Sequence, residues 1–305
     1  MRNPSTMTLT RRLSIRLEQI RQARIIHGGL VSLGLAALAV KLSRLPIPSR
    51  RVRRRLFRDQ YVRRYPPGLA ESESERPLED YPSLNALFTR GLRPEARPIA
   101  ADRSVVLSPC DGRVQDVGRV DGGTLLTVKG IEYSVASLLA EVDARPFERG
   151  LFAIVFLSPI DCHRVFSPAD GRLDRVVHVP GSRLLVHPPL QRAEYPVYTL
   201  NERVVLHLST DAGPIVVVMV AGWGVGHITG PLVPRFRAGA RRVESFACDP
   251  PSPVARGDWM ATFELGSTVV LLTPPAPGAI PLVTPNEKVR YGQPLFGLDE
   301  PAGDR

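Results

Sequence analysis

From Ser104 onward, short apolar runs rich in β-branched residues alternate with turns rich in glycine and proline. Runs of this length, bounded by turn residues, predict strands rather than helices. The clearest of them read SVVLSP, GRVQDVGRV, GTLLTVKG, LFAIVFLSP, GPIVVVMVAG and STVVLLTPP. The pattern therefore favours a compact β sandwich or a partly closed barrel.

Helical patterns are fewer and shorter than strand patterns. The stretch YPSLNALFTRGLRPEARPI, from Tyr81 to Ile99, predicts a helix with Ser83 as N-cap that ends near Gly91. The segment SVASLLAEV, from Ser134 to Val142, predicts a second helix. We therefore expect an α+β fold with a mainly-β core and N-terminal helices.

One predicted strand is interrupted by a Gly-Ser pair. The stretch FELGSTVVLL runs from Phe263 to Leu272, and a glycine inside a strand marks a bulge or a close backbone approach. In a constrained turn, the serine hydroxyl can attack the preceding carbonyl and convert the amide into an ester. Elimination of that ester leaves dehydroalanine, which hydrolyses to a pyruvoyl group. On its own the pair is better explained by an ordinary β-bulge.

The charge of the chain is concentrated in its first 60 residues. They contain 14 Lys or Arg and two acidic residues, a net charge of +12, whereas the whole chain carries +10. The same segment contains the apolar run IIHGGLVSLGLAALAV, from Ile25 to Val40. Basic arms that bind nucleic acid rarely contain such a run, so we expect no nucleic-acid partner.

The apolar run at residues 25–40 is slightly short for a membrane-spanning helix, which needs roughly 17–25 residues. It is bracketed by cations, including the run RRVRRRLFR from Arg50 to Arg58. We predict that residues 1–60 form an arm that associates with an anionic membrane surface. Whether the run spans the bilayer or lies on it stays open, and a solvated tail or a signal peptide is the alternative. Residues 61–305 would form the β-rich domain, held peripherally at the cytoplasmic side of the cell membrane.

Several common site types have no counterpart in the sequence. The three cysteines, Cys110, Cys162 and Cys248, show no metal-ligand spacing, and no P-loop or dinucleotide motif is present. A serine hydrolase using Ser267 would need the G-x-S-x-G elbow, which FELGSTVVLL lacks. We therefore expect no metal, and that hydrolase reading is disfavoured.

Two loops after predicted strands carry polar side chains suited to catalysis. SPCDGRV, from Ser108 to Val114, places Asp111 in an Asp-Gly turn. FLSPIDCHRVFSP, from Phe156 to Pro168, contains His163 and Arg164. Catalytic groups are commonly presented on loops of this kind, although a turn aspartate or a surface histidine is the ordinary alternative.

Taken together and in order, these segments resemble the phosphatidylserine decarboxylase family, whose pyruvoyl-dependent enzymes make phosphatidylethanolamine. The resemblance covers roughly residues 80–298. It is carried by LNALFTRGLRPEARPI, SPCDGRV, LSPIDCHRVFSP, VPGSRLLV, LNERVVL, FELGST and YGQPLFG. The family also has an N-terminal membrane-associating region, which agrees with the charge argument.

The resemblance implies a role for each matching position. Self-cleavage would fall between Gly266 and Ser267, giving a β chain of residues 1–266 and an α chain of residues 267–305. Ser267 would become the covalent pyruvoyl cofactor, which carries the hard chemistry on a phosphatidylserine substrate. His163 matches the histidine thought to assist decarboxylation, and Asp111 matches the aspartate of the self-cleavage triad. Arg164 is a chemical candidate for holding the acidic headgroup, and the family suggests a homodimer.

One position departs from the family pattern. The family usually reads H-R-x-H, whereas this chain has Phe166 in place of the second histidine, the base that activates the serine. The base could be His163 or a histidine brought close by folding, namely His178, His187, His207 or His227. Alternatively, backbone strain alone drives a slow cleavage. The competing hypothesis is a cleavage-deficient, non-catalytic lipid-binding relative.

Overall fold

The computed structural model describes residues 8–27, 38, 40–63, 71–127, 130–223, 228–236, 240–264 and 267–298 of the chain. It confirms the α+β class with a mainly-β core, and the core sheet is not a closed barrel. The helical segments are α1 (Leu9–His27), α3 (Arg50–Arg54), the π-helix Arg55–Val62, α4 (Leu84–Phe88), α5 (Val135–Leu139), α6 (Val197–Leu200), and short 3₁₀ turns at Glu71–Glu73, Leu78–Asp80, Pro94–Ala96, Arg145–Phe147 and Pro188–Leu190.

The strands form one large sheet and three small ones. The strands are β1 (Val105–Leu107), β2 (Gly112–Arg119), β3 (Thr124–Leu126), β4 (Glu132–Ser134), β5 (Leu151–Leu157), β6 (Arg164–Phe166), β7 (Gly171–Val179), β8 (Arg203–Thr210), β9 (Gly213–Ala221), β10 (Ile228–Thr229), β11 (Glu244–Val254), β12 (Trp259–Phe263), β13 (Ser267–Thr273), β14 (Ile280–Pro281), β15 (Lys288–Val289) and β16 (Pro294–Gly297). The large sheet has the order β11-β7-β8-β9-β13-β5-β2-β15, and its neighbours are antiparallel.

Both faces of the large sheet are buried. Along β13, Val269 and Leu271 belong to one core cluster, whereas Val270 and Leu272 belong to the other. One face is covered by the β10-β12-β6 and β1-β16-β14 sheets, and we call it the β-covered face. The opposite face packs against α5, α6 and the β3-β4 hairpin. This double coverage explains why the central strands read as continuous apolar runs instead of alternating ones.

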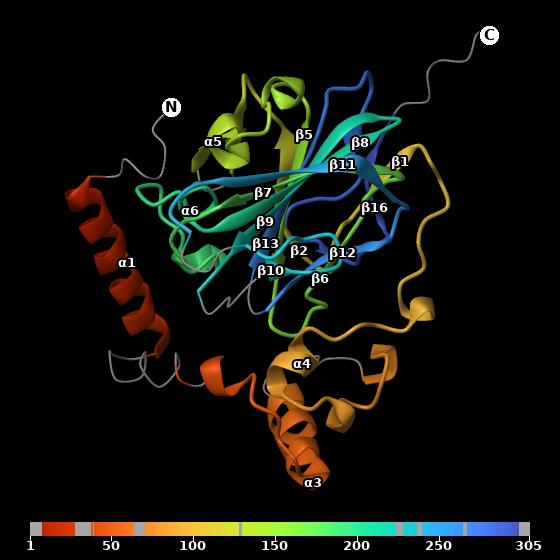
Figure 1. Ribbon diagram of the computed structural model, residues 1–305. Coiled ribbons are helices and arrows are strands. Elements are labelled where there is room, and N and C mark those ends of the chain that lie inside the picture. The colour runs from red at the N-terminus through yellow and green to blue at the C-terminus, as the bar shows by residue number, and fades with distance from the viewer. Residues whose placement is uncertain are drawn as a thin grey trace.

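The predicted helices form where the sequence places their caps. The hydroxyl of Ser83 accepts a hydrogen bond from the backbone N–H of Ala86, and this cap opens α4. Ser134 caps α5 in the same way. Figure 1 shows α3 and α4 below the strand-rich body and α1 at its side.

The arginine run at residues 50–58 packs against the polar segment that follows it. Arg50 pairs with Asp80, with nitrogen and oxygen 2.9 Å apart, and Arg58 pairs with Glu71. The polar stretch PPGLAESESERPLED, from Pro66 to Asp80, predicts an exposed connector, but its Leu78 is buried with Phe57 in a small apolar cluster. That part of the prediction is wrong, because apolar contacts with the basic helix bury Leu78.

Candidate active site

The Gly-Ser pair lies at the junction of two strands. β12 ends at Phe263 and β13 begins at Ser267, and the two strands belong to different sheets. The expectation of one strand interrupted at its middle is therefore wrong. The register explains it, because β12 pairs with β6 and β10, whereas β13 pairs with β5 and β9. Leu265 and Gly266 lie outside the described residues.

Ser267 is fully buried and its hydroxyl is unsatisfied. Its Oγ has no hydrogen-bond partner among the residues that the structure describes. Leaving a buried polar group unpaired costs about 1–3 kcal/mol, so such groups are rare and call for an explanation. A reactive hydroxyl that attacks a neighbouring carbonyl would supply one.

The sheet register brings three predicted site residues to one edge. Ser267 pairs with Leu157 at the end of β5, and Asp111 precedes the start of β2, which pairs with β5 on its other side. Two strand spacings separate β13 from β2, which is roughly 10 Å. His163 lies six residues beyond Leu157, in the loop that leaves the same edge. Asp111 and Ser267 are therefore too far apart for a direct hydrogen bond, and proton transfer between them would need an intermediate group.

Gly112 fixes the position of Asp111. A Cβ atom on Gly112 would lie 2.5 Å from the backbone oxygen of Phe156, closer than any real contact. Only glycine lets β2 approach β5 this closely. The Asp-Gly pair thus serves strand packing as well as the turn that the sequence predicts.

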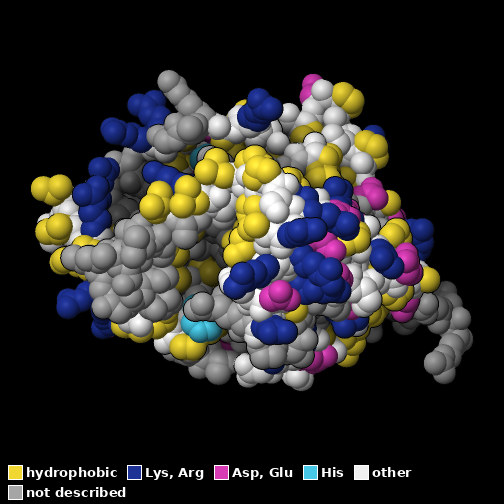
Figure 2. Space-filling view, turned by 90° about the horizontal axis from the view of Figure 1, so that it is seen from below, with side chains coloured by type: hydrophobic (Ala, Val, Ile, Leu, Met, Phe, Trp, Pro, Cys, Tyr) yellow, Lys and Arg dark blue, Asp and Glu magenta, His cyan; other side chains and the backbone are white. Residues whose placement is uncertain are grey.

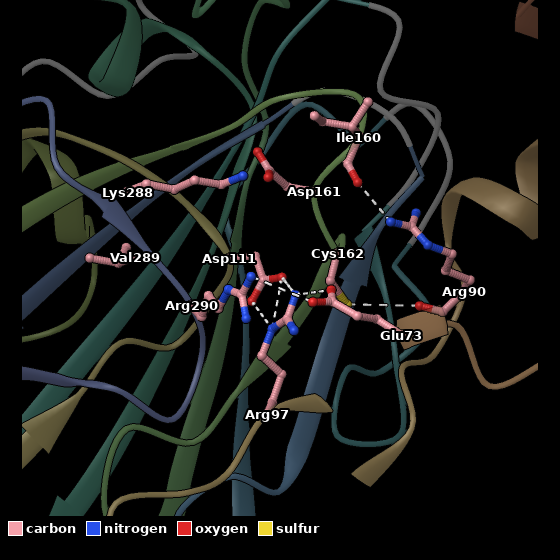
Figure 3. Close-up of a pocket in the computed structure, with 10 residues that line it drawn as sticks. All are labelled: Glu73, Arg90, Arg97, Asp111, Ile160, Asp161, Cys162, Lys288, Val289 and Arg290. Carbon is pink, nitrogen blue, oxygen red and sulfur yellow. Dashed lines mark hydrogen bonds and ion pairs between the residues drawn. The ribbon is translucent and has the colours of Figure 1, made fainter. Parts of the chain in front are cut away.

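Asp111 is held by a buried arginine. The guanidinium of Arg97 donates to both carboxylate oxygens of Asp111, at 2.6–3.1 Å, and the backbone N–H of Tyr291 donates at 3.0 Å. Burial alone would lower the pKa of Arg97, but its hydrogen bonds with Asp111 and Glu73 raise it overall. Figure 3 shows these groups around a small cavity of about 70 Å³, where Lys288 and Asp161 point toward each other.

Phe166 occupies the space beside this pair. Its backbone N–H donates to the carbonyl of Pro109, and its ring stacks on Tyr291. Together with Cys162, the two rings form a separate apolar cluster. Position 166 is thus close to Asp111, as a triad base would have to be, but it carries a hydrocarbon ring.

His163 is fully buried and neutral at physiological pH. The pKa of His163 is lowered to about 3, mainly by burial and also by the nearby Arg90 charge, although a hydrogen bond with the Asp161 carbonyl opposes the shift. The Nδ1 atom lies 3.0 Å from that carbonyl oxygen, so Nδ1 carries the proton. The Nε2 atom has no partner within the described part of the chain and presents a bare lone pair.

Comparison with known proteins identifies the family. The sequence profile described as phosphatidylserine decarboxylase matches residues 84–297. The chain belongs to the phosphatidylserine decarboxylase family. It is 40% identical over 253 residues to a protein of Halorhodospira halophila named phosphatidylserine decarboxylase proenzyme, covering 82% of this chain and 84% of the relative. Proteins of the same name from Anaeromyxobacter sp. (36%; 87% of this chain and 94% of the relative) and Alkalilimnicola ehrlichii (38%; 72% and 78%) are also similar.

Within this family site, the other candidate histidines lie away from Ser267. His178 reaches β13 only across β8 and β9, a separation of about 14 Å at three strand spacings. His207 aligns through β9 with Leu272, five residues along β13 from Ser267. The ring of His187 packs on Phe156, which faces the α-helical side of the sheet. His227 lies outside the described residues.

The cysteines of the site are poor bases and nucleophiles. Burial raises the pKa of Cys162 to about 11, and the Asp111 charge adds to this effect. Burial likewise raises the pKa of Cys110 well above its usual value. Both therefore stay protonated at neutral pH.

Arg164 is engaged by structural partners. Its Nε donates to the carbonyl of Thr89 at 3.3 Å, and its guanidinium lies 4.3 Å from the ring centre of Trp259. A longer ion pair, at 3.8 Å, joins it to Glu75. These contacts link the N-terminal segment to β12, and the role of Arg164 in headgroup binding stays a prediction.

A second, larger cavity lies along the same edge of the large sheet. The motifs predict no role for the residues that line it. Its volume is about 930 Å³, and its lining includes Arg183, Glu202, Val204, Ile228 and Arg235. Glu202 lies between this cavity and Ser267. Its backbone carbonyl accepts a hydrogen bond from the N–H of Ala221, the residue that pairs with Ser267. Arg183 lies in the motif VPGSRLLV and Glu202 in LNERVVL. The fold brings them together as an ion pair, with guanidinium nitrogen and carboxylate oxygen 2.8 Å apart.

Proposed function

We propose that this chain is a proenzyme that cuts itself between Gly266 and Ser267 and then decarboxylates phosphatidylserine to phosphatidylethanolamine. The observation that carries the proposal is the unpartnered, fully buried hydroxyl of Ser267 at the start of β13, directly after a glycine. Thr268 and Thr273 of the same strand also have unpartnered hydroxyls, so Ser267 is distinguished by its place directly after a glycine, where the self-cleavage chemistry requires a reactive hydroxyl. The naming of the relatives as proenzymes supports the same reading.

The residues around Ser267 fit a pyruvoyl group. Ser267 would provide its three carbons, and its complete burial between β5 and β9 excludes water from it. Once formed, the group supplies an electrophilic carbonyl that withdraws electrons from the substrate as carbon dioxide leaves. His163, neutral and anchored at Nδ1, can hold or release a proton at Nε2 beside this centre.

The 930 Å³ cavity suits the headgroup of phosphatidylserine. That headgroup carries a phosphate, a carboxylate and an ammonium, so it needs cationic and anionic partners. Arg183 and Arg235 provide the positive charges and Glu202 provides the negative one. Val204 and Ile228 add apolar surface for the beginning of the acyl chains.

Helix α1 supports membrane association at the mouth of this cavity, because its Gln19 lines the cavity wall. The helix docks through polar contacts, including a hydrogen bond from Leu185 N–H to Gln22 at 2.9 Å. Its leucines face outward instead: Leu9, Leu13 and Leu17 are 84%, 57% and 59% exposed. Arg12, Arg16 and Arg24 are exposed on the same helix. An outward apolar ridge flanked by arginines suits a helix lying in an anionic leaflet.

Three further observations concern the predicted membrane-associating arm, residues 1–60. Among the described residues, no helix is long and apolar enough to cross a bilayer. Most of the apolar run at residues 25–40 lies outside the described residues. Figure 2 shows basic and apolar side chains mixed on the lower face of the molecule. We propose peripheral attachment at the cytoplasmic side of the cell membrane; the homodimer and the boundary at residue 60 stay predictions.

The experiment is a lipid conversion assay with the purified full-length chain. Vesicles containing phosphatidylserine are incubated with the wild type or with Ser267→Ala, and the lipids are separated by headgroup. We expect phosphatidylethanolamine only with the wild type. Equal lipid profiles for the two proteins would contradict the proposal and favour the non-catalytic lipid-binding relative.

A further inference from the structure

The missing histidine at position 166 raises the question of which group activates Ser267. We propose that His163 is the base for self-cleavage in this chain, and that Asp111 takes no part in the proton transfer. This inference rests on the proposed function, and it assigns His163 a step beyond the decarboxylation that the family resemblance implies. Three structural arguments support it: the face of the sheet, the state of the two side chains, and the pairing of Asp111.

The first argument is the face on which Ser267 lies. Side chains alternate along a strand, so Ser267 shares the face of Val269 and Leu271, which is the β-covered face. The sheet that covers this face near Ser267 contains β6 and β12. His163 directly precedes β6, and its carbonyl accepts from Phe263 N–H at 3.0 Å, four residues before Ser267. His163 therefore lies on the correct face and at the correct edge.

The hydroxyl of Ser267 and the free ring nitrogen of His163 are complementary as proton donor and proton acceptor. Ser267 offers a buried hydroxyl without a partner, and His163 offers a buried nitrogen without a partner, both within the described part of the chain. The Asp161 carbonyl fixes the tautomer that leaves Nε2 free, and Phe88 packs on the imidazole with ring centres 3.8 Å apart. The two atoms do not share a hydrogen bond in the structure, and catalytic hydrogen bonds commonly tighten only as the reaction proceeds.

The third argument is the pairing of Asp111. Both of its carboxylate oxygens are occupied by Arg97, and one also accepts from Tyr291 N–H. The positive charge of Arg97 already compensates Asp111, and Phe166 provides no group that could bridge it to Ser267. In this chain Asp111 serves as an anchor for Arg97 and the Tyr291 turn.

The proposed step balances without any further reactant. The Ser267 Oγ proton moves to His163 Nε2 as Oγ forms a bond to the Gly266 carbonyl carbon. The bond between that carbon and the Ser267 nitrogen breaks, and the proton on Nε2 passes to the nitrogen. The product is an ester with a free amine, an isomer of the starting chain.

The test compares self-cleavage of four full-length chains: the wild type, His163→Asn, the control His207→Asn, and Ser267→Ala. The asparagine amide at 163 can still donate to the Asp161 carbonyl, so the variant keeps that anchor and loses only the base. Cleavage is followed over time by denaturing gel electrophoresis, and a thermal melt is recorded for each chain. We expect cleavage of His163→Asn to be slower by at least about tenfold, because a base of low pKa contributes less than the usual ~100-fold. His207→Asn should cleave at the wild-type rate, because His207 aligns with Leu272, five residues along β13 from Ser267.

Each outcome separates this inference from the proposed function. A wild type that never cleaves would contradict both. A wild type that cleaves, with folded His163→Asn cleaving equally fast, would overturn the inference alone. If His163→Asn does not fold, the pH profile of the wild type decides. Buried His163 keeps the cleavage rate constant from pH 8 down to about pH 5, whereas a base of ordinary histidine pKa would lose rate below pH 6.5.

Discussion

Phe166 and Tyr291 stack with their ring centres 3.7 Å apart and their planes inclined by 16°. The backbone N–H of the same Tyr291 donates to Asp111. The stack therefore places two aromatic rings beside Asp111. Position 166, where the family resemblance predicts a histidine, is a packed aromatic position in this chain.

Replacing Phe166 with histidine tests whether position 166 limits cleavage. If His163 is the base, position 166 takes no part in the proton transfer, and Phe166→His should self-cleave within about threefold of the wild-type rate. A threefold change corresponds to less than about 1 kcal/mol in activation free energy. The variant should also be less stable by about 1 kcal/mol or more, because the aromatic pair is lost. Time-resolved gels and thermal melts measure the two effects. A tenfold or larger acceleration would show that the chain lacks an adequate base.

Removing the charge of Arg97 should strongly destabilise the fold. Arg97→Met removes the cation that is hydrogen-bonded to both oxygens of the buried Asp111 carboxylate, which costs about 3–5 kcal/mol. The matched control is Arg103→Met, whose ion pair with Asp170 lies at the surface and should contribute less than about 1 kcal/mol. Urea unfolding of the two variants measures both values. Equal small losses would show that the Arg97–Asp111 pair is not an anchor.

Much of the architecture could be predicted from the sequence, for a local reason. The runs LFAIVFLSP and GPIVVVMVAG form β5 and β9, because apolar residues bounded by turn residues suit buried strands. Asp111, His163 and Ser267 could be proposed from their motifs, and the register brings all three to one sheet edge.

The remaining features depend on contacts between distant segments. The break between β12 and β13 is hidden because FELGSTVVLL has no strong turn signal, and only the pairing partners separate the strands. Arg97 is 14 residues from Asp111, and nothing local marks the two as a pair. The outward leucines of α1 follow from its docking on the segment around Leu185, which a helical pattern cannot reveal.

The stability of the fold should depend on pH through His163. Its pKa is about 3 in the folded protein and near 6.5 when unfolded, so the unfolded chain binds more protons between these values. The contribution of His163 to the free energy of unfolding is therefore fully present above pH 6.5. It decreases by up to about 1.4 kcal/mol per pH unit as the pH drops below that value. The polar groups near the ring are Arg90 and the Asp161 carbonyl, Phe88 packs on the ring itself, and none of the three offers a negative charge to offset protonation. Urea unfolding of wild type and His163→Asn between pH 5 and 8 should show a smaller slope for the variant, and identical slopes would contradict this assignment.

The leucine ridge of α1 should contribute to membrane binding. Leu13→Ser with Leu17→Ser removes two exposed apolar side chains, each worth about 1.5–3 kcal/mol if fully buried in the leaflet. Co-sedimentation with vesicles containing an anionic lipid should therefore weaken at least tenfold. Ile280→Ser is the matched control, because Ile280 is 54% exposed on β14, away from α1. Equal pelleting of the double variant and the control would contradict a membrane role for the ridge.

The central claim is that the backbone opens between Gly266 and Ser267 and converts the serine. Intact mass spectrometry of the full-length protein, purified without denaturation, tests it most directly. We predict two chains, residues 1–266 and residues 267–305, with the smaller one lighter by one ammonia than a peptide that begins with serine. A single unbroken chain of 305 residues, or a small chain that begins with unmodified Ser267, would contradict the account.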